Sequence, residues 1–451
     1  MAKFDNHPTV RWWREQSTNN PKTSTVALNS DSLRTLCLDA GADDVGFVEI
    51  YRPAIADQHA EILAVFPPTK TLISFVCCMN RESVRTPARS IANLEFHANY
   101  DHADEVARNL VKAFAQIGVR ALNPSVAFPM EMDRYPDKKA WIISHKPVAV
   151  EAGLGHIGIH RNVIHPKFGN FIALGTVLID TEVTEYAHPI NYNPCIECKL
   201  CVAACPVGAI GADGSFSFSA CYTHNYREFM GGFTDWTETI ADSKSASDYR
   251  KKVSASESAS MWQSLSFKPN YKAAYCIAAC PAGEDVIAPF LSDRKAFIKD
   301  VVKPLQDKTE TIYVVPGSDA ENYVVKHFPN KTVKLVSSGI RPQSIQGFLF
   351  GLPLLFQRNQ SEGLSAIYHF TFTGSESRRA TVTIQNKMVR VQEGHLGKAN
   401  ISVTADSKTW LGFLGKEQNL IWALLRCKIR VSGSLKLLQA FGKCFPTCNI
   451  H

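Results

Sequence analysis

The stretch PCIECKLCVAACP, residues 194–206, decides what the middle of this chain can fold around. Its cysteines follow the spacing C-x2-C-x2-C-x3-C and precede a proline, as in proteins whose thiolates hold a pair of iron–sulfur clusters. The first three thiolates then bind one cluster, and the fourth binds the other. Zinc sites use C-x2-C pairs separated by longer loops, so the triple run disfavours zinc. We therefore predict that a 4Fe-4S cluster is bound by Cys195, Cys198 and Cys201.

A second, less regular run lies downstream at residues 275–281, YCIAACP. It reads only C-x3-C-P, and Ala273 stands where a full repeat of the first run would place another cysteine. The crossed pattern assigns Cys280 to the first cluster, and Cys205 and Cys276 to the second. We expect Cys221 to be the third ligand of the second cluster.

This assignment leaves the second cluster one thiolate short. Three outcomes stay open: a 3Fe-4S cluster, a 4Fe-4S cluster closed by a non-cysteine group such as His224, or no second cluster. The other six of the 13 cysteines show no ligand spacing, and we expect them to be small buried side chains. They are Cys37, Cys77, Cys78, Cys427, Cys444 and Cys448.

Upstream of the cysteines the pattern indicates an α/β unit. Residues 32–40 and 104–117 have helical spacing, and residues 45–48, 71–76 and 171–180 have the short apolar runs of buried strands. Between them, residues 151–158 contain G-x-G-x-x-G, formed by Gly153, Gly155 and Gly158. No acidic residue follows where a ribose partner is expected, so this block is a weak signal for nucleotide binding.

The order of these segments resembles epoxyqueuosine reductases and reductive dehalogenases over residues 30–290. The resemblance rests on the glycine block, the Phe168-Gly169 turn, the strand ending at Asp180 and the cysteine run, with Tyr100-Asp101-His102 as a weaker match. It implies a nitroreductase-like α/β domain that holds cobalamin, joined to a dicluster ferredoxin domain. The three glycines would then approach the corrinoid closely, because no side chain intervenes.

What the resemblance implies chemically is a relay of single electrons from the clusters to a corrinoid that reduces a small substrate. A flavodoxin or ferredoxin would be the electron donor. The catalytic acid of the queuosine enzymes has no clear match, so the catalytic residues are unassigned. Acidic candidates are Glu131, Asp133 and Glu151, and histidine candidates are His102, His156, His160 and His165.

The last third of the chain has a different pattern. Residues 366–374, 380–384, 388–394 and 399–405 alternate as in an antiparallel sheet, and residues 409–415, 419–427 and 434–441 have helical spacing. This region resembles sterol-carrier-protein domains over residues 335–448, as an α+β fold. The resemblance implies an apolar tunnel that accepts a lipid or another small apolar ligand.

Together these features predict five segments: an N-terminal tail at 1–30, the α/β and possible corrinoid domain at 31–190, the ferredoxin-type domain at 191–300 with a polar insertion at 231–269, a linker at 301–334, and the sterol-carrier-like domain at 335–448. The leading function is a corrinoid-dependent iron–sulfur reductase of a small lipophilic substrate. The alternatives are a ferredoxin-like electron carrier without corrinoid and a lipid-binding protein with structural clusters.

The remaining expectations concern environment and partners. The N-terminus shows no basic start followed by an apolar core, and no apolar run is long enough to span a membrane, so we expect a cytoplasmic protein. The net charge of +7 alone does not call for nucleic acid. The sterol-carrier-like region replaces the RNA-holding module of the queuosine enzymes, which disfavours an RNA substrate.

Overall fold

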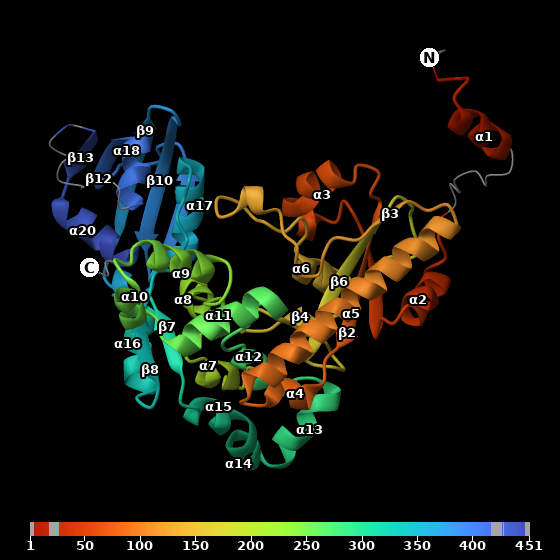
Figure 1. Ribbon diagram of the computed structural model, residues 1–451, viewed down its shortest axis with the longest axis horizontal. Helices are drawn as coiled ribbons and strands as arrows, with labels where there is room; N and C mark the ends of the chain where they lie inside the picture. Colours follow the sequence, from red (N-terminus) through yellow and green to blue (C-terminus); the bar gives the residue numbers. More distant parts are fainter. Residues whose placement is uncertain (1–3, 18–26, 416–425, 427, 447–451) are drawn as a thin grey trace.

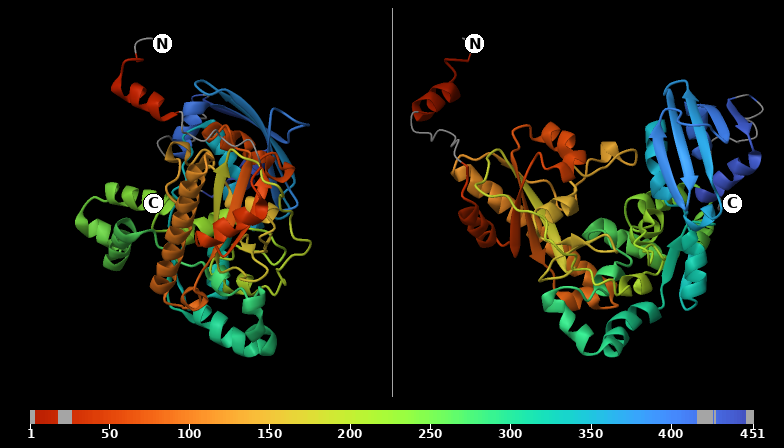
Figure 2. Two further views of the ribbon diagram at one scale, coloured as in Figure 1. Left: turned by 90° about the vertical axis from the view of Figure 1, so that its right-hand side faces the viewer. Right: turned by 180° about the vertical axis from the view of Figure 1, so that it is seen from behind.

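The computed structural model describes residues 4–17, 27–415, 426 and 428–446. Its α/β region and its C-terminal region diverge as two arms from a cluster-bearing region at the base (Figure 1). The reverse view in Figure 2 shows the same arrangement, with the base made by residues of the middle third of the chain.

The α/β region is built on a four-stranded sheet in the order β1-β2-β6-β3, and every neighbouring pair is antiparallel. The central strand β2 is buried over nearly its whole length because helices cover both faces of the sheet. The predicted layers of helix and strand are confirmed, whereas the nitroreductase-like class stays a prediction. The strands are β1 (Asp44–Glu49), β2 (Thr71–Cys78), β3 (Ala121–Leu122) and β6 (Ile172–Ile179). One face carries α2 (Ser30–Asp39) and α5 (Arg89–Gln116), and the other carries η1 (Pro53–Gln58), α3 (His59–Val65) and α6 (His145–Glu151).

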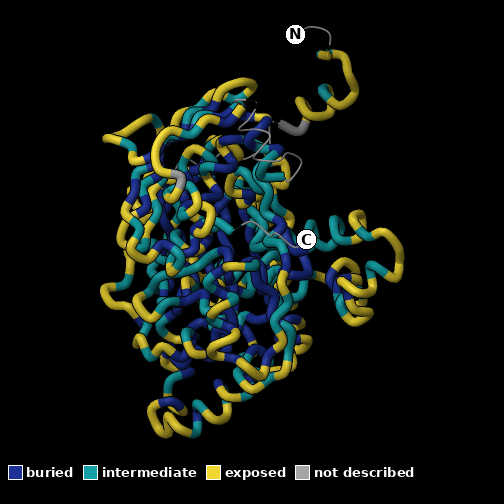
Figure 3. The backbone as a smooth tube through the Cα atoms, turned by 90° about the vertical axis from the view of Figure 1, so that its left-hand side faces the viewer, coloured by how far each residue is buried: buried dark blue, intermediate teal, exposed yellow. Residues whose placement is uncertain are grey.

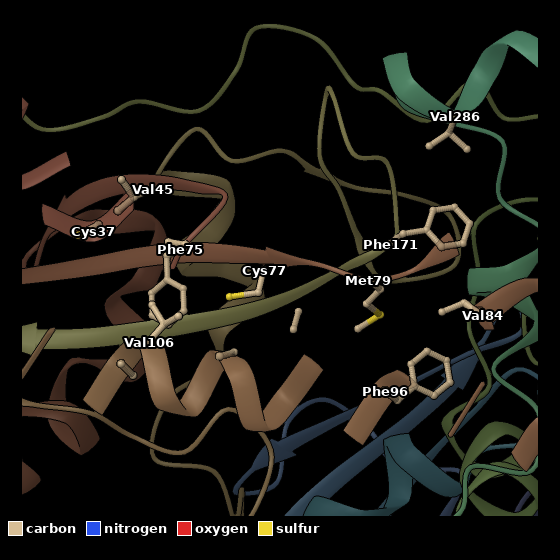
Figure 4. Close-up of a cluster of buried hydrophobic side chains, with 14 of the residues drawn as sticks. Cys37, Val45, Phe75, Cys77, Met79, Val84, Phe96, Val106, Phe171 and Val286 are labelled. Atoms are coloured by element: carbon tan, nitrogen blue, oxygen red, sulfur yellow. The ribbon is translucent and has the colours of Figure 1, made fainter. Parts of the chain in front are cut away.

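Helix α5 is longer than the sequence pattern predicts, because it begins at Arg89 and has 28 residues. Its C-terminal half packs on the sheet through Val106, Leu110 and Phe114. Its N-terminal half reaches the cluster-bearing region, where the Asn93 side chain donates to the backbone carbonyl of Tyr271 at 3.0 Å. Figure 4 shows the resulting continuous core, which runs from the sheet to the helices beyond it.

Short helices and turns form the cluster-bearing region. They include α4 (Arg81–Arg85), the hairpin β4 (His156–Ile157) and β5 (Val163–Ile164), α7 (Leu200–Ala204), α8 (Phe218–Asn225), α12 (Tyr275–Ala278) and α13 (Glu284–Ser292). The polar insertion, expected as a loop with some helix, is mostly helical and stands out from the body (Figure 2). Its helices are α9 (Gly231–Ala241), α10 (Ala246–Lys252) and α11 (Ala255–Phe267), the last beginning with a capping box of Ser254 and Glu257.

The expected linker at 301–334 is folded. Its parallel strands β7 and β8 are joined through α16, and buried Ile312, Val314 and Val324 pack in one cluster with Cys201 and Cys205. Apolar alternation in this stretch is too short to predict the two strands from the sequence. The elements are α14 (Arg294–Phe297), the π-helical turn η3 (Ile298–Val302), α15 (Lys303–Asp307), β7 (Thr311–Val314), α16 (Asp319–His327) and β8 (Thr332–Leu335).

The C-terminal region is a five-stranded sheet in the order β11-β10-β9-β12-β13 with helices on one face. The expected antiparallel sheet needs one correction, because β12 pairs with β9 in parallel. A chain that returns to the middle of the sheet through a crossover pairs in parallel there, and strand patterns do not reveal it. The strands are β9 (Ala366–Thr373), β10 (Arg378–Gln385), β11 (Met388–Glu393), β12 (Ile401–Asp406) and β13 (Ile429–Gly433); the helices are α17 (Ile345–Leu355), η4 (Asn359–Ser361), α18 (Ser407–Leu414) and α20 (Leu435–Cys444). Most of the helix predicted at 419–427 lies outside the described residues.

The cysteines outside the two runs are buried as expected at Cys37, Cys77 and Cys444, and half-buried at Cys78; Cys427 and Cys448 lie outside the described residues. The N-terminal helix α1 (Pro8–Ser17) projects from the body and is largely exposed (Figure 3). Within the described residues, no helix combines the length and the apolar character that crossing a membrane requires.

Candidate iron–sulfur centre and the adjoining pocket

Four cysteines from two distant stretches line one small pocket, as the crossed assignment predicts. Three come from the first run and one from the second, and His160 and Ile159 complete much of the wall. The fold brings the two runs together because α12 packs against α7 in the shared core. The four are Cys195, Cys198, Cys201 and Cys280.

The remaining three cysteines form a second group, which adjoins the first at Cys201. Cys205, Cys221 and Cys276 pack in one cluster with β7 and α16, and each lies close enough to another to influence its ionisation. Among the described residues, no three His, Cys, Asp or Glu side chains converge as ligands of a single metal ion would. Three closely spaced thiols completed by a fourth from a distant stretch are the donor set of an iron–sulfur cluster, whereas zinc sites use C-x2-C pairs separated by longer loops.

The sulfur atoms lie among backbone N–H groups. The amide of Ala209 donates to Cys205 Sγ at 3.3 Å. Burial raises the pKa of Cys280 to about 12 and that of Cys276 to about 11. The free thiols therefore stay protonated at neutral pH, and cluster binding must release their protons.

Two arginines beside these cysteines, the half-buried Arg85 and the buried Arg89, form no salt bridge among the described residues, although Glu82 and Glu310 are their nearest acidic neighbours. Arg85 lies near Cys280 and Arg89 near Cys276, and burial lowers the pKa of both guanidinium groups. In each, Nε and one terminal nitrogen are buried without a hydrogen-bond partner. Unpaired buried cations are costly, and an anionic cluster held by thiolates would compensate them. The donor set and its surroundings thus fit iron–sulfur clusters.

His224, the non-cysteine ligand considered for the second cluster, faces elsewhere. Its Nδ1 accepts the backbone N–H of Tyr313 at 3.3 Å, and its charged neighbours are led by Glu310. Burial lowers its pKa to about 4, so the imidazole is neutral. Its Nε2 has no hydrogen-bond partner among the described residues, but the surroundings of the ring give no support for a ligand role.

The packing of the chain itself explains why glycine stands at the three positions predicted to approach a corrinoid. A Cβ at Gly153 would lie 2.8 Å from the carbonyl oxygen of His188, and one at Gly155 would lie 2.3 Å from that of Ile164. At Gly158 the Ile164 side chain would be 2.7 Å away. The chain's own atoms occupy the places where these side chains would lie, so each glycine is explained by packing within the fold, and its contact with a corrinoid stays a prediction.

Most of the acid and histidine candidates also have structural partners. Glu151 binds Arg52 at 3.0 Å, and Asp133 is exposed in the turn η2 (Met132–Arg134). The histidines are bonded as follows: His102 Nε2 to the Gly41 carbonyl at 3.1 Å, His156 Nδ1 to the Ile157 carbonyl at 3.2 Å, His160 Nδ1 to the Asn162 amide at 3.1 Å, and His165 Nε2 to Asp44 at 3.1 Å. Of the three acids proposed from the sequence, Glu131 lines a pocket of the described structure.

That pocket has a volume of about 450 Å³, within the range of small-molecule sites. It lies between α5 and the segment 123–143 and has both polar and apolar walls. Two lining residues were missed by the sequence patterns, Asp104 and Arg108, because they lie inside an ordinary amphipathic helix. Its lining also includes Asn123, Ser125, Phe128, Met130, Glu131, Trp141 and Ile143.

Asp104 is the acid in this pocket with altered ionisation. Burial raises the pKa of Asp104 above its ordinary value, although the Val126 amide donates to its Oδ1 at 3.0 Å and opposes the shift. A carboxyl group of this kind holds its proton closer to neutral pH and can act as a general acid.

Aromatic rings connect the pocket with the second cysteine group. Tyr226 lies near Cys221, and its ring is 4.7 Å from that of Phe229. Phe229 meets Phe128 of the pocket edge-on at 6.0 Å. The hydroxyl of Tyr135, from the pocket segment, also bonds that of Tyr222 on α8. The pocket is therefore joined by contacting side chains to the helix that carries Cys221.

The same pocket segment contacts the C-terminal region. The Gln343 amide donates to Asp137 Oδ1 at 3.2 Å. Gly347, in the first turn of α17, lies so close that a Cβ there would sit 1.9 Å from that oxygen. The segment 123–143 thus touches all three parts of the molecule, as its path toward α17 in Figure 1 also shows.

Comparisons with known proteins agree with the sequence resemblance. A 4Fe-4S binding domain model matches residues 188–211, and the SCP-2 sterol transfer family matches residues 355–446. An epoxyqueuosine reductase of Cellulophaga algicola is 36% identical over 106 residues, which are 22% of this chain and 32% of that enzyme. A tetrachloroethene reductive dehalogenase of Desulfitobacterium hafniense is 30% identical over 168 residues, or 37% of this chain and 28% of that enzyme. The chain thus spans about a third or less of these relatives.

Solved structures give weaker likenesses. A reductive dehalogenase structure covers 63% of this chain and 36% of its own, with 15% identity and a TM-score of 0.39. The epoxyqueuosine reductase of Streptococcus thermophilus covers 60% and 75%, with 16% identity and a TM-score of 0.34. Sterol carrier protein 2 of Yarrowia lipolytica covers 23% and 92%, with 12% identity and a TM-score of 0.20.

The chain is therefore an iron–sulfur protein similar to epoxyqueuosine reductases and reductive dehalogenases in its middle, followed by a sterol-carrier-type domain. This confirms the fusion expected from the sequence.

Proposed function

We propose that this protein is an oxidoreductase in which iron–sulfur clusters supply single electrons to an acceptor bound in the pocket between α5 and the segment 123–143. The observation that carries the proposal is the contact of Phe128, in the pocket wall, with Phe229 and through it with Tyr226 beside the cysteines. Closely packed side chains of this kind bring a buried redox centre within reach of a bound molecule.

Asp104 acts in this proposal as the proton donor. Reduction of a bound molecule by electrons from a cluster leaves negative charge on it, and a carboxyl group with a raised pKa can neutralise that charge. Arg108, in the same wall, offers a cation that can orient an anionic group of the substrate. The sequence resemblance suggests a small substrate, and the adjacent sterol-carrier-type domain suggests a lipophilic one.

The resemblance suggests a corrinoid as the acceptor. The pocket itself does not support this part of the proposal. At the glycines predicted to hold the corrinoid, the chain's own atoms occupy the places where side chains would lie. A corrinoid exceeds the drug-sized ligands for which a volume of about 450 Å³ is suited. Its binding would require the segment 123–143 to move, so we route no step through it.

The C-terminal region completes the proposal as the site that binds an apolar ligand before its reduction. Its contact with the pocket segment through Asp137 and Gly347 supports this order. A flavodoxin or ferredoxin would reduce the clusters, as the resemblance suggests.

The test is anaerobic reconstitution of the full chain with iron, sulfide and added cobalamin, followed by metal analysis and electron paramagnetic resonance. Reduced clusters that are reoxidised by an added small acceptor, with a rate that falls in Asp104→Asn, support the proposal. Stoichiometric cobalt would establish the corrinoid acceptor, and its absence would remove that part. The control is a Phe128→Ala, Asp104→Asn double variant. If every added acceptor reoxidises the wild-type clusters no faster than the clusters of this variant, a reaction in this pocket is contradicted.

A further inference from the structure

The turns into α12 and α7 share a left-handed residue directly before the helix, although Glu197 in the first turn is also left-handed and Lys272 in the second is not. Lys199 and Ala274 are both non-glycine residues in the left-handed region, with φ, ψ of 61°, 17° and 56°, 26°. Each caps a short helix whose second residue is a cysteine ligand, Cys201 or Cys276. A left-handed conformation costs a non-glycine residue on the order of 1 kcal/mol, so its presence at both places marks two equivalent turns.

This equivalence assigns a role to the position before each left-handed residue. In the first turn it is Cys198, which lines the first pocket. In the second turn it is Ala273, which is buried with 6% of its surface exposed. The second turn therefore keeps the backbone of a ligand position without the thiol.

Hydrogen bonds hold Ala273 between the helices that carry two of the second group's cysteines. Its amide donates to Asn225 Oδ1 at 3.0 Å, and the Lys272 amide donates to the Asn225 carbonyl at 3.1 Å. Asn225 ends α8, which carries Cys221, while Ala273 directly precedes the turn into α12, which carries Cys276. The Asn225 side-chain oxygen already accepts a hydrogen bond, and His224 Nδ1 accepts one from the Tyr313 amide on β7.

We propose that the second cluster is a four-iron cluster bound by three protein thiolates, Cys205, Cys221 and Cys276, whose fourth iron lies toward Ala273 without a protein ligand. This iron would take a small ligand from solution, water or hydroxide, because Ala273 is buried and carries no ligand atom. The inference rests on the proposed function only in requiring that both cysteine groups bind clusters. It predicts one exchangeable iron in each chain.

The test compares three full-length chains reconstituted anaerobically: wild type, Ala273→Cys and Ala273→Val. Valine has nearly the size of cysteine and no atom that can bind iron, so it controls for steric effects. Iron and acid-labile sulfide are measured, and electron paramagnetic resonance spectra are recorded before and after one equivalent of ferricyanide. We expect wild type and Ala273→Val to lose one iron per chain and gain the signal of an oxidised three-iron cluster. Ala273→Cys should keep all its iron and show no three-iron signal.

The first cluster serves as an internal control in each sample. If it forms and wild type keeps all iron after oxidation, or binds iron for only one cluster, this inference is overturned while the proposed function survives. If neither cluster forms in folded protein, both fail. Should Ala273→Cys not fold, cyanide added to wild type replaces it as the probe: a changed second-cluster spectrum supports the open iron, and an unchanged one contradicts it.

Discussion

The cluster-bearing region and the C-terminal region differ in how their interiors are completed. The first has seven buried or half-buried thiols and two arginines, Arg85 and Arg89, each with two N–H nitrogens that lack hydrogen-bond partners among the described residues. The second closes its interior with aromatic side chains from the sheet and its helices: Phe348, Tyr368, Phe370, Phe372, Trp410 and Phe441. The difference indicates that the folded state of the first depends on an inorganic partner, whereas hydrophobic burial suffices for the second.

The largest effect is expected from Cys198→Ala, which tests whether the cluster-bearing region depends on its clusters. We expect complete loss of the first cluster's signal and a destabilised cluster-bearing region, because metal binding and folding are coupled. Iron analysis and electron paramagnetic resonance measure the loss, and calorimetry follows unfolding. Cys276→Ala is the control from the other group and should leave the first cluster's signal intact; joint loss of both signals in folded protein would refute the crossed assignment.

A matching change in the C-terminal interior is Phe370→Ala. Phe370 is fully buried, with its ring 5.8 Å from Trp410 and 5.5 Å from Phe441. Truncation should lower the stability of this region by about 3–5 kcal/mol through lost burial and a cavity. Denaturant unfolding followed by tryptophan fluorescence measures it. Thr371→Ala, on the opposite face of the same strand, should cost far less, and the cluster signals should not change in either variant.

Asp104→Asn tests the proposed reaction while leaving the interiors of both regions unchanged. The variant should slow substrate reduction by roughly 10²–10⁴-fold, the usual contribution of a general acid, with cluster content unchanged. Because the pKa of Asp104 is raised, the wild-type rate should fall as pH rises through that pKa, when the carboxyl loses its proton. Rates across a pH series measure this. An asparagine variant with the wild-type profile would exclude Asp104 as the donor.

Arg85→Leu tests whether the buried cations compensate the clusters. Loss of a positive charge near Cys280 should lower the first cluster's reduction potential, because the added electron is less stabilised, by an amount on the order of tens of millivolts. A redox titration monitored by electron paramagnetic resonance measures it. Arg120→Leu, which removes an arginine stacked on Phe66 instead, should leave the potential unchanged; equal shifts would show that the effect is not local.

The smallest effect is expected where the C-terminal region meets the pocket segment. Asp137→Ala removes the acceptor for the Gln343 amide and should weaken this contact by about 1 kcal/mol. Hydrogen exchange of α17 and of the segment 123–143 would report it as faster exchange in both. The exposed Asp133 provides the control in the same segment, and its alanine variant should exchange like wild type.

The parts that could be predicted from the sequence are those in which chemistry follows local spacing. The C-x2-C repeat and the crossed pattern predicted the four cysteines that line the first pocket. Short apolar runs predicted most strands of the first sheet, and alternation predicted most strands of the C-terminal sheet. The buried arginines and Asp104 could not be predicted, because they lie on ordinary helices and acquire their surroundings only when distant segments pack together. The folded segment 301–334 and the parallel pairing of β9 with β12 were missed for the same reason.

The most direct test of the central claim is the metal and sulfide content of the full chain purified without oxygen. The account predicts iron and acid-labile sulfide in nearly equal amounts, enough for two clusters, with electron paramagnetic resonance signals that respond separately to Cys198→Ala and Cys276→Ala. Stoichiometric zinc without sulfide, in protein that is folded, would contradict it.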